Sequence, residues 1–331
     1  MKRCACSART GLLQAMLAAG LLAAALPAMS QGAWPARPIR LIVPFPAGGA
    51  LDTVGRVTAQ ALAERLDTSV VVENRGGASG AIGVNEAARA APDGHTLVFA
   101  SSDTLTILPL LRRNLPFDPV RDLAPVAKVA DSYLMFAVHP SVPVNSIREL
   151  IELSKAKPGS LRYATPGNGT VHHMSFEYFN LLTGAQISQV PFNGGGPATA
   201  AVIGGHVEVL ITGFNVFKSV LAGQLRGLAV AKPTRSTLMP AVPSMAESGV
   251  ADYRASSWFG VFGPAGLPND IALRVGRELV AIAATPEFQQ KVTAVGGDAG
   301  GLPRDEFVRF LAAESRYWQK IIEATHIRLD D

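Results

Sequence analysis

Short runs of valine, leucine and isoleucine alternate along this chain with stretches in which apolar residues recur at helical spacing. Such apolar runs are typical of strands buried on both faces, and their alternation with helices is typical of βαβ units. The predicted strands cover residues 39–45, 70–72, 96–100, 134–138, 161–165, 188–192, 207–212, 225–231 and 257–262. The predicted helices cover residues 51–66, 146–155, 171–183, 197–204, 216–222, 270–284, 286–295 and 304–325. The sequence therefore predicts an α/β fold.

The length of the chain, 331 residues, indicates more than one hydrophobic core. We expect the chain to leave a first lobe near residues 133–138 and to return to it near residues 254–261. The first lobe then consists of residues 31–136 plus 254–331, and the second lobe of residues 137–253. The first lobe is thus predicted to be discontinuous, because it is built from both ends of the chain.

The N-terminus has the three parts of a secretory signal peptide. Lys2, Arg3 and Arg9 precede an apolar run over residues 11–27, and small residues follow as far as Ser30. The run is short for a membrane-spanning helix, which needs about 20 residues, although an uncleaved anchor remains an alternative. We expect residues 1–30 to be removed and the mature protein to enter the periplasm. Both cysteines, Cys4 and Cys6, would leave with this segment, so no disulfide or thiolate site is expected.

The charge balance gives no indication of a polyanionic partner. The chain has 30 Lys+Arg against 26 Asp+Glu. Removal of three basic residues with the signal peptide leaves 27 against the same 26, a net charge of +1. Neither nucleic acid nor an anionic membrane surface is therefore expected as a partner.

Four strand-to-helix junctions are rich in glycine, serine, threonine and proline: residues 44–52, 101–104, 165–170 and 191–198. Glycine lets the chain turn sharply and lets a ligand approach the backbone closely. Exposed N–H groups at a helix N-terminus form an anion site without a cationic side chain. In open α/β sheets such turns gather at the carboxyl ends of the strands, where ligands bind. Glycine that merely ends a strand is the alternative at any one junction, but four junctions together favour a binding cleft.

Motifs of catalysis and cofactor binding are missing or incomplete. The chain has no G-x-x-x-x-G-K-[ST] motif, and its Gly167-Asn168-Gly169 lacks the third glycine of a dinucleotide site. His172 and His173 are adjacent, so on a helix they point about 100° apart and cannot share one metal ion; one of them is expected to cap or line the pocket. Asp52, in a first helical turn, is also typical of a residue that complements the helix dipole. We expect no catalytic residue, metal or cofactor.

The chain resembles the Bug-type solute receptors of tripartite tricarboxylate transporters from about Trp34 to the C-terminal helix. The resemblance rests on many short motifs in family order. They are residues 34–35, 38–40, 43–52, 72–80 (VENRGGASG), 93–97 (DGHTL), 163–170 (YATPGNGT), 190–192 (VPF), 223–229 (GQLRGLA), 243–249 (PSMAESG) and 258–260 (WFG).

This resemblance implies a type II-like periplasmic binding protein fold. Two lobes, each with a central mostly parallel sheet flanked by helices, would close about a hinge of two crossing segments. A small carboxylate would be held by backbone amides. The partner would be the membrane permease subunits of such a transporter. We expect the protein itself to be a monomer. The implied ligand-binding residues are Phe45, Ala47, Gly48, Gly49, Asp52, Ser101, Ser102, Asp103, Thr165, Gly167, Gly169, Thr170, Pro191, Phe192, Gly194, Ala198 and Thr212.

Some positions depart from the family pattern. Thr165-Pro166 replaces the usual Ser-Ser or Ser-Gly, residues 105–109 replace His-Ala-Ile-Asn-Pro, and Asn193 stands where a basic residue is frequent. The loss of a basic residue suggests a ligand with less negative charge than a tricarboxylate. Two other functions remain as alternatives: a ligand-sensing co-receptor for a membrane sensor protein, and an exported hydrolase or lyase, for which no Ser/His/Asp spacing gives support.

Overall fold

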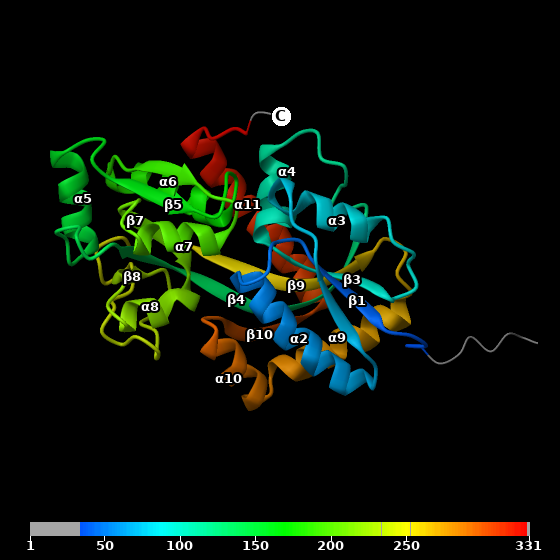
Figure 1. Ribbon diagram of the computed structural model, residues 1–331. Helices are drawn as coiled ribbons and strands as arrows, with labels where there is room; N and C mark the ends of the chain where they lie inside the picture. Colours follow the sequence, from blue (N-terminus) through cyan, green and yellow to red (C-terminus); the bar gives the residue numbers. More distant parts are fainter. Residues whose placement is uncertain (1–33, 233, 252, 330–331) are drawn as a thin grey trace, which may run out of the picture. The chain divides into compact units, whose positions relative to one another are not determined.

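Strands and helices alternate through the structure as the sequence indicates (Figure 1). The computed structural model describes residues 34–232, 234–251 and 253–329, so the predicted signal peptide lies outside the described residues. From Arg37 onward the chain forms one compact unit. In the described part of the chain, no helix combines the length and the apolar character needed to cross a membrane.

The first of two sheets takes its strands from the N-terminal and C-terminal parts of the described chain. Strands β1, β2 and β3 pair in parallel, and β9 pairs antiparallel with β3. Its strands are β1 (Ile39–Val43), β2 (Val70–Asn74), β3 (Thr96–Ser101), β9 (Ser256–Pro264) and β10 (Asp298–Pro303). The accompanying helices are α2 (Ala50–Leu66), η1 (Ala78–Gly80), α3 (Ala81–Ala88), η2 (Asp103–Ile107), α4 (Leu108–Leu111), α9 (Asn269–Ala283), α10 (Pro286–Ala294) and α11 (Arg304–Thr325).

The second sheet is formed by the middle of the chain. Its strands are β5 (Arg162–Thr165), β6 (Ser188–Pro191), β7 (Val209–Gly213) and β8 (Arg226–Val230), with β5 parallel to both β6 and β7. Its helices are α5 (Ile147–Ala156), α6 (Val171–Thr183), α7 (Gly195–Ile203), η3 (Phe214–Val216) and α8 (Phe217–Leu221).

A single long strand, β4 (Leu123–Val138), belongs to both sheets. Its first part pairs with β9 and β10, and its last part, from Leu134, pairs with β7 and β8. At the change of partner, Leu134 N–H donates to the carbonyl of Ala255 on the returning segment. Both segments that we expected to cross between the lobes therefore lie side by side, while the lobe boundaries at residues 136 and 254 stay a prediction.

Both sheets are mixed, although most strands of each run in one direction. Parallel pairing is confined to the outer strands β1, β2, β3, β5, β6 and β7, whereas every pair that involves β4 or β9 is antiparallel. The reason is topological. The chain passes to the second sheet along β4 and comes back along β9, so these adjacent strands must run in opposite directions.

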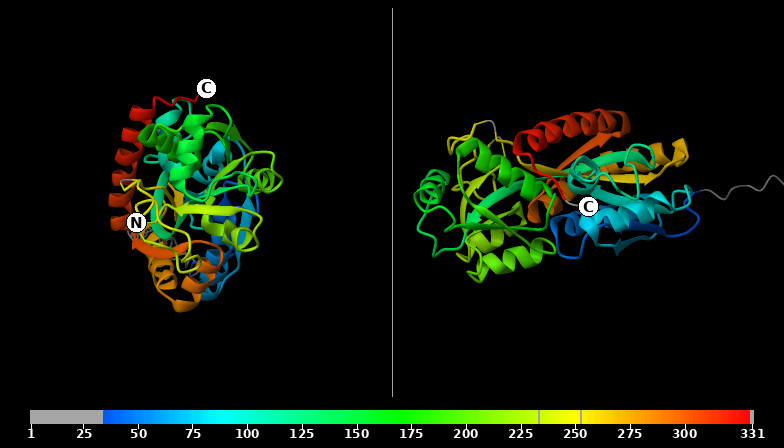
Figure 2. Two further views of the ribbon diagram at one scale, coloured as in Figure 1. Left: turned by 90° about the vertical axis from the view of Figure 1, so that its left-hand side faces the viewer. Right: turned by 90° about the horizontal axis from the view of Figure 1, so that it is seen from above.

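Helix α11 contributes to the cores of both sheets. Phe307, near its start, packs with Trp258 of β9, whereas Trp318 belongs to the core that contains Phe136 and Tyr163 of the second sheet. The helix contacts α6 as well as β10, and it is the red helix that all three views show beside the sheets (Figures 1 and 2). Because each core includes part of α11, the helix links the two sheets independently of the crossing strands.

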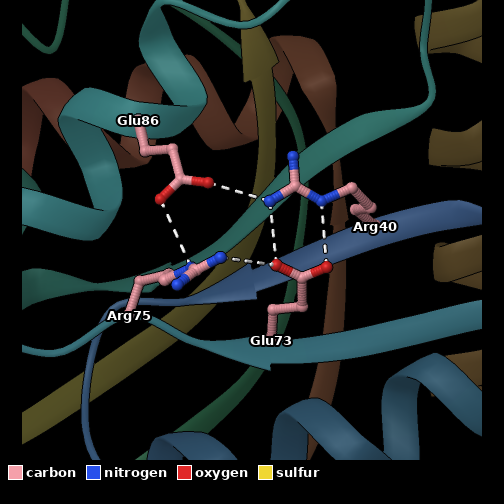
Figure 3. Close-up of polar contacts among 4 residues, drawn as sticks. All are labelled: Arg40, Glu73, Arg75 and Glu86. Atoms are coloured by element: carbon pink, nitrogen blue, oxygen red, sulfur yellow. Dashed lines mark hydrogen bonds and ion pairs between the residues drawn. The ribbon is translucent and has the colours of Figure 1, made fainter.

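Four charged residues connect β1, β2 and α3 (Figure 3). The Arg40 guanidinium donates two hydrogen bonds to Glu73, of 3.0 and 2.8 Å, and one to Glu86, of 2.8 Å. Arg75 lies 3.3 Å from the Glu73 carboxylate and 3.4 Å from that of Glu86. The hydrogen bonds from Arg40 hold the pKa of Glu73 below its usual value. These motif residues therefore have a structural role at the edge of the sheet.

Replacement of Glu73 by Gln should lower the free energy of unfolding by about 1 kcal/mol at pH 7, because the side chains are half-buried and screened only in part. The folded-state pKa of Glu73 lies below its ordinary value of 4.5. Its stabilisation is therefore complete above that value and is lost as the pH falls through the folded-state pKa. Urea denaturation of the wild-type and Glu73→Gln proteins should show a difference in unfolding free energy that narrows below pH 4.5.

Glu152→Gln is the matched control, because its partner Arg148 and Glu152 itself are largely exposed on α5. We expect this control to change the unfolding free energy by less than about 0.5 kcal/mol. Equal losses in the two variants would contradict the role given to Glu73.

Candidate functional site

A cavity of about 420 Å³ lies where the two sheets meet. Its wall combines the loop before α2, the loop before α7, the end of β7 and the adjacent crossing strands. Ser132 and Leu134 line it from β4, and Ser257 and Phe259 line it from β9. Both crossing segments and both sheets thus contribute to one cavity.

The first wall is the junction that leads into α2, and a buried acid fixes its shape. The Asp52 carboxylate is 4% exposed and accepts a 2.9 Å hydrogen bond from the Gly48 N–H. Asn74 donates to Asp52 (2.8 Å) and to the carbonyl of Phe45 (3.0 Å). Burial by itself raises the pKa of Asp52, but hydrogen bonds from Arg56, Gly48 and Asn74 outweigh it and lower the pKa overall.

The position of Asp52 explains why the loop turns toward the cavity. Gly48 has φ +88°, a conformation that side chains rarely adopt, and the N-cap Gly49 offers no side chain to cap the helix. The first N–H groups of a helix have no intrahelical partner. The N-terminus of α2 therefore presents backbone donors at the cavity wall, with the positive end of the helix dipole behind them.

The second wall repeats this arrangement at α7. Its N-cap Gly194 has φ +112°, and no side chain caps the helix. Among the described residues, apart from the chain neighbours and the nearby helix backbone, no atom lies within 4 Å of the place where a Cβ of Gly194 or Gly196 would be. The Gly194 N–H donates to the carbonyl of Pro166, which fixes the loop against β5. Because Asn193 and residues 194–197 all line the cavity, a second helix N-terminus opens onto the same space.

Hydroxyl groups line the base of the cavity. Ser132 and Thr212 are 3% and 4% exposed, and within the described residues neither hydroxyl has a hydrogen-bond partner. The Ser257 hydroxyl, in contrast, pairs with that of Ser102 at 2.8 Å. Buried hydroxyl groups normally have partners, so the free ones are available to a ligand.

Asp103, the first residue of η2, lies against the start of α6, and the two histidines are in the first turn of that helix. Asp103 Oδ1 accepts from the Val171 N–H (2.6 Å), and its Oδ2 accepts from the Ser101 hydroxyl (3.0 Å). His173 Nδ1 accepts from the Gly169 N–H (3.2 Å), and burial lowers the pKa of His173 to about 4. His172 lines the cavity, as we expected of one histidine of this pair. Among the described residues, its Nδ1 is buried without a hydrogen-bond partner.

The structure divides the predicted site residues into two groups. Those that line the cavity are Phe45, Ala47, Gly48, Gly49, Asp103, Thr170, Gly194 and Thr212. Those outside the lining are Asp52, Ser101, Ser102, Thr165, Gly167, Gly169, Pro191, Phe192 and Ala198. Several of the second group hold the first in place, as Asp52 does for Gly48 and Ser101 for Asp103. Contact of any of them with a ligand stays a prediction.

Sequence reasoning missed other residues of the wall. They are Pro46, Ala50, Leu51, Ser132, Leu134, Pro166, Asn193, Gly195, Gly196, Pro197, Thr199, Ala200, Ile203, Gly213, Asn215, Val216, Ser219, Ser257 and Phe259. Ser257 lies in the predicted crossing segment 254–261 and could have been found by that signal, because crossing segments border the cleft. Ser132 lies just before the other predicted segment, within the longer strand β4. Across the described part of the chain, no three His, Cys, Asp or Glu side chains converge as metal ligands would.

Replacement of Asn74 by Ala should lower the free energy of unfolding by about 1–3 kcal/mol, since it removes the side-chain donor to the Phe45 carbonyl and one of the two donors to Asp52 Oδ1, which keeps Arg56 at 3.0 Å. Urea denaturation without ligand measures this loss. Asn85→Ala is the control, because the Asn85 amide accepts only from the exposed Arg89 side chain. A loss for Asn74→Ala no larger than for Asn85→Ala would contradict the role of Asn74.

Comparison with known proteins agrees with the fold. The family model of the tripartite tricarboxylate transporter family receptor, TctC, matches residues 54–327. Protein BugT of Bordetella pertussis is 36% identical over 303 residues, 91% of this chain and 93% of that protein. Two solved structures are also similar.

The structure of R. palustris Rpa4515 with adipate has a TM-score of 0.86 and 31% identity, and the match covers 89% of this chain and 99% of that one. The structure of MatC from Rhodopseudomonas palustris with bound malate has a TM-score of 0.79 and 26% identity, over 87% and 100% of the two chains. These matches confirm the resemblance and the predicted fold. The chain therefore belongs to the tripartite tricarboxylate transporter receptor family, whose members are periplasmic solute-binding receptors and not enzymes.

Proposed function

We propose that this protein captures a small carboxylate between its two sheets and delivers it to the membrane permease subunits of a tripartite tricarboxylate-type transporter. One observation carries the proposal: the glycine-capped N-termini of α2 and α7 open onto the same cavity. Backbone N–H groups from both walls can hydrogen-bond one carboxylate, and both helix dipoles favour its negative charge. The relatives crystallised with adipate and malate support the same ligand class.

The mechanism needs a closed form that binds the ligand better than an open form does. In our proposal the lobes are residues 31–136 plus 254–331 and residues 137–253, and they move about the segments near Leu134 and Ala255. Donors from only one wall would face the carboxylate in an open form, whereas donors from both walls reach it on closure. The ligand thereby favours the closed form, which a permease can distinguish from the open one.

Export completes the proposal. Residues 1–30 act as a signal peptide, and the mature chain begins at Gln31. The intact mass of protein recovered from a periplasmic fraction tests this point: a mass that still includes residues 1–30 would contradict cleavage.

A thermal-shift screen of the mature protein tests the ligand class. The protein is first unfolded and refolded to remove any bound ligand, and it is then mixed with mono-, di- and tricarboxylates, including adipate and malate. A ligand at about 100 times its Kd adds about 2.7 kcal/mol of stability, which raises Tm by roughly 4–8 °C in a protein of this size. No shift with any carboxylate, in protein shown to be folded, would refute the proposal.

Gly196→Leu tests the position of the ligand. Gly196 lies on the cavity wall in the first turn of α7, so a leucine side chain would enter open space. We expect the ligand-induced rise in Tm to fall by at least half. The Tm without ligand is the internal control, because Pro197 disfavours the helical conformation of a leucine before it; the ligand-induced rise is therefore measured from the variant's own ligand-free Tm. A full ligand shift in this variant would place binding elsewhere.

A further inference from the structure

The cavity wall carries one acidic side chain and no basic one. Among the described residues that line it, Asp103 is the acid, and neither lysine nor arginine is present. The wall therefore combines two sources of positive potential, the N-termini of α2 and α7, with one fixed negative charge. An anionic ligand is attracted by the two helix N-termini and repelled by Asp103. The distribution of charge in the ligand decides which of these effects is larger.

Asp103 is held firmly in its place on the wall. Its side chain is 9% exposed, and its two oxygens accept from the Val171 N–H and the Ser101 hydroxyl. The Val171 N–H belongs to the first turn of α6, whose dipole stabilises a carboxylate at that position. Asp103 thus occupies the anion site of a third helix N-terminus. Since each carboxylate oxygen can accept two hydrogen bonds, both retain acceptor capacity.

The neighbouring groups do not neutralise Asp103. His172 lines the same cavity, but burial lowers its pKa, so the imidazole is neutral at pH 7 even though Asp103 opposes that shift. The other polar side chains of the wall, such as Ser132, Thr212 and Asn215, are uncharged. A ligand group that comes to lie near Asp103 therefore meets an acceptor with a negative charge.

We propose that Asp103 makes this receptor selective for ligands that carry one carboxylate and, at the other end, a hydrogen-bond donor such as an ammonium or hydroxyl group. This inference rests on the proposed function and specifies its ligand. The carboxylate binds at the N-termini of α2 and α7, and the donor group faces Asp103. A second carboxylate at that end is repelled at short range in a site of low effective dielectric constant, and it has no hydrogen to donate to Asp103.

Ligand pairs of matched length test this selectivity. Succinate and 4-aminobutyrate, glutarate and 5-aminopentanoate, and adipate and 6-aminohexanoate differ within each pair only in one terminal group. Isothermal titration calorimetry of the refolded mature protein should show at least about tenfold tighter binding of the amino acid in the best-fitting pair, or about 1.4 kcal/mol. The corresponding hydroxy acid should bind with intermediate affinity.

The variant Asp103→Asn tests whether Asp103 causes the selectivity, because it removes the negative charge and keeps the shape of the side chain. The asparagine oxygen can still accept from Val171 N–H, and its amide can donate to the Ser101 hydroxyl. In this variant we expect the ratio of the two affinities to shrink by about tenfold or more. Asp67→Asn is the matched control: Asp67 ends α2 in the left-handed conformation, which asparagine adopts readily, and it does not line the cavity. The control should leave the ratio unchanged.

Each result decides between the proposals. If the dicarboxylates bind as well as or better than the amino acids, the selectivity is refuted while the carboxylate-receptor proposal stands. An unchanged ratio in Asp103→Asn refutes the role of Asp103. If no member of any pair binds to protein shown to be folded, the selectivity is refuted; the broader carboxylate screen then decides whether the proposed function fails with it.

Discussion

Continuous backbone pairing along β4 sets the geometry on which the rest of the molecule depends. Its 16 residues hydrogen-bond first to β9 and β10 and then to β7 and β8. One extended segment therefore fixes the positions of both sheets and of the helices that pack on them. The cavity lies beside the point where β4 changes partners, and Ser132 and Leu134 contribute to its wall there. The walls are separate in sequence, but the same strand aligns them.

Recognition in this cavity depends on backbone groups more than on ionised side chains. Glycine at the starts of α2 and α7 serves two purposes: it allows the positive φ of Gly48 and Gly194, and it leaves the helix N–H groups uncovered. The buried Asp52 and the partly buried Asn74 keep the first of these loops in shape without lining the cavity. The polarity of the site is thus preorganised, which reduces the ordering cost of binding.

Local signals predicted some elements well because the residues that end them are themselves diagnostic. Helix α6 covers the predicted residues 171–183, with Thr170 as the N-cap that accepts from His173 N–H and Gly184 in the left-handed conformation at its end. The glycine-rich junctions were recognisable for the same reason: a sharp turn before a helix needs particular residue types. Seven of the 16 predicted site residues in these junctions line the cavity.

Elements that depend on distant partners could not be predicted in this way. Strand β10, with the sequence DAGGLP, has little β propensity and exists because it pairs with β4. The first part of β4 contains Pro125 and the buried Lys128, which obscure an apolar strand pattern. The same holds for Ser132, whose position beside the cavity follows from the pairing of β4 with β9 and not from its neighbours in sequence.

Helix α11 has a mechanical consequence for any opening of the cavity. One end of this stiff rod is embedded in the core of the first sheet through Phe307, and Trp318 is embedded in the core of the second. Bending at the two crossing strands alone would pull one of these side chains out of its core. The rod also contacts η2 and α6, the elements that carry Asp103 and Val171. If the lobes close as we propose, the wall with Asp103, which lies next to α11, should therefore be displaced less than wall segments farther from this helix.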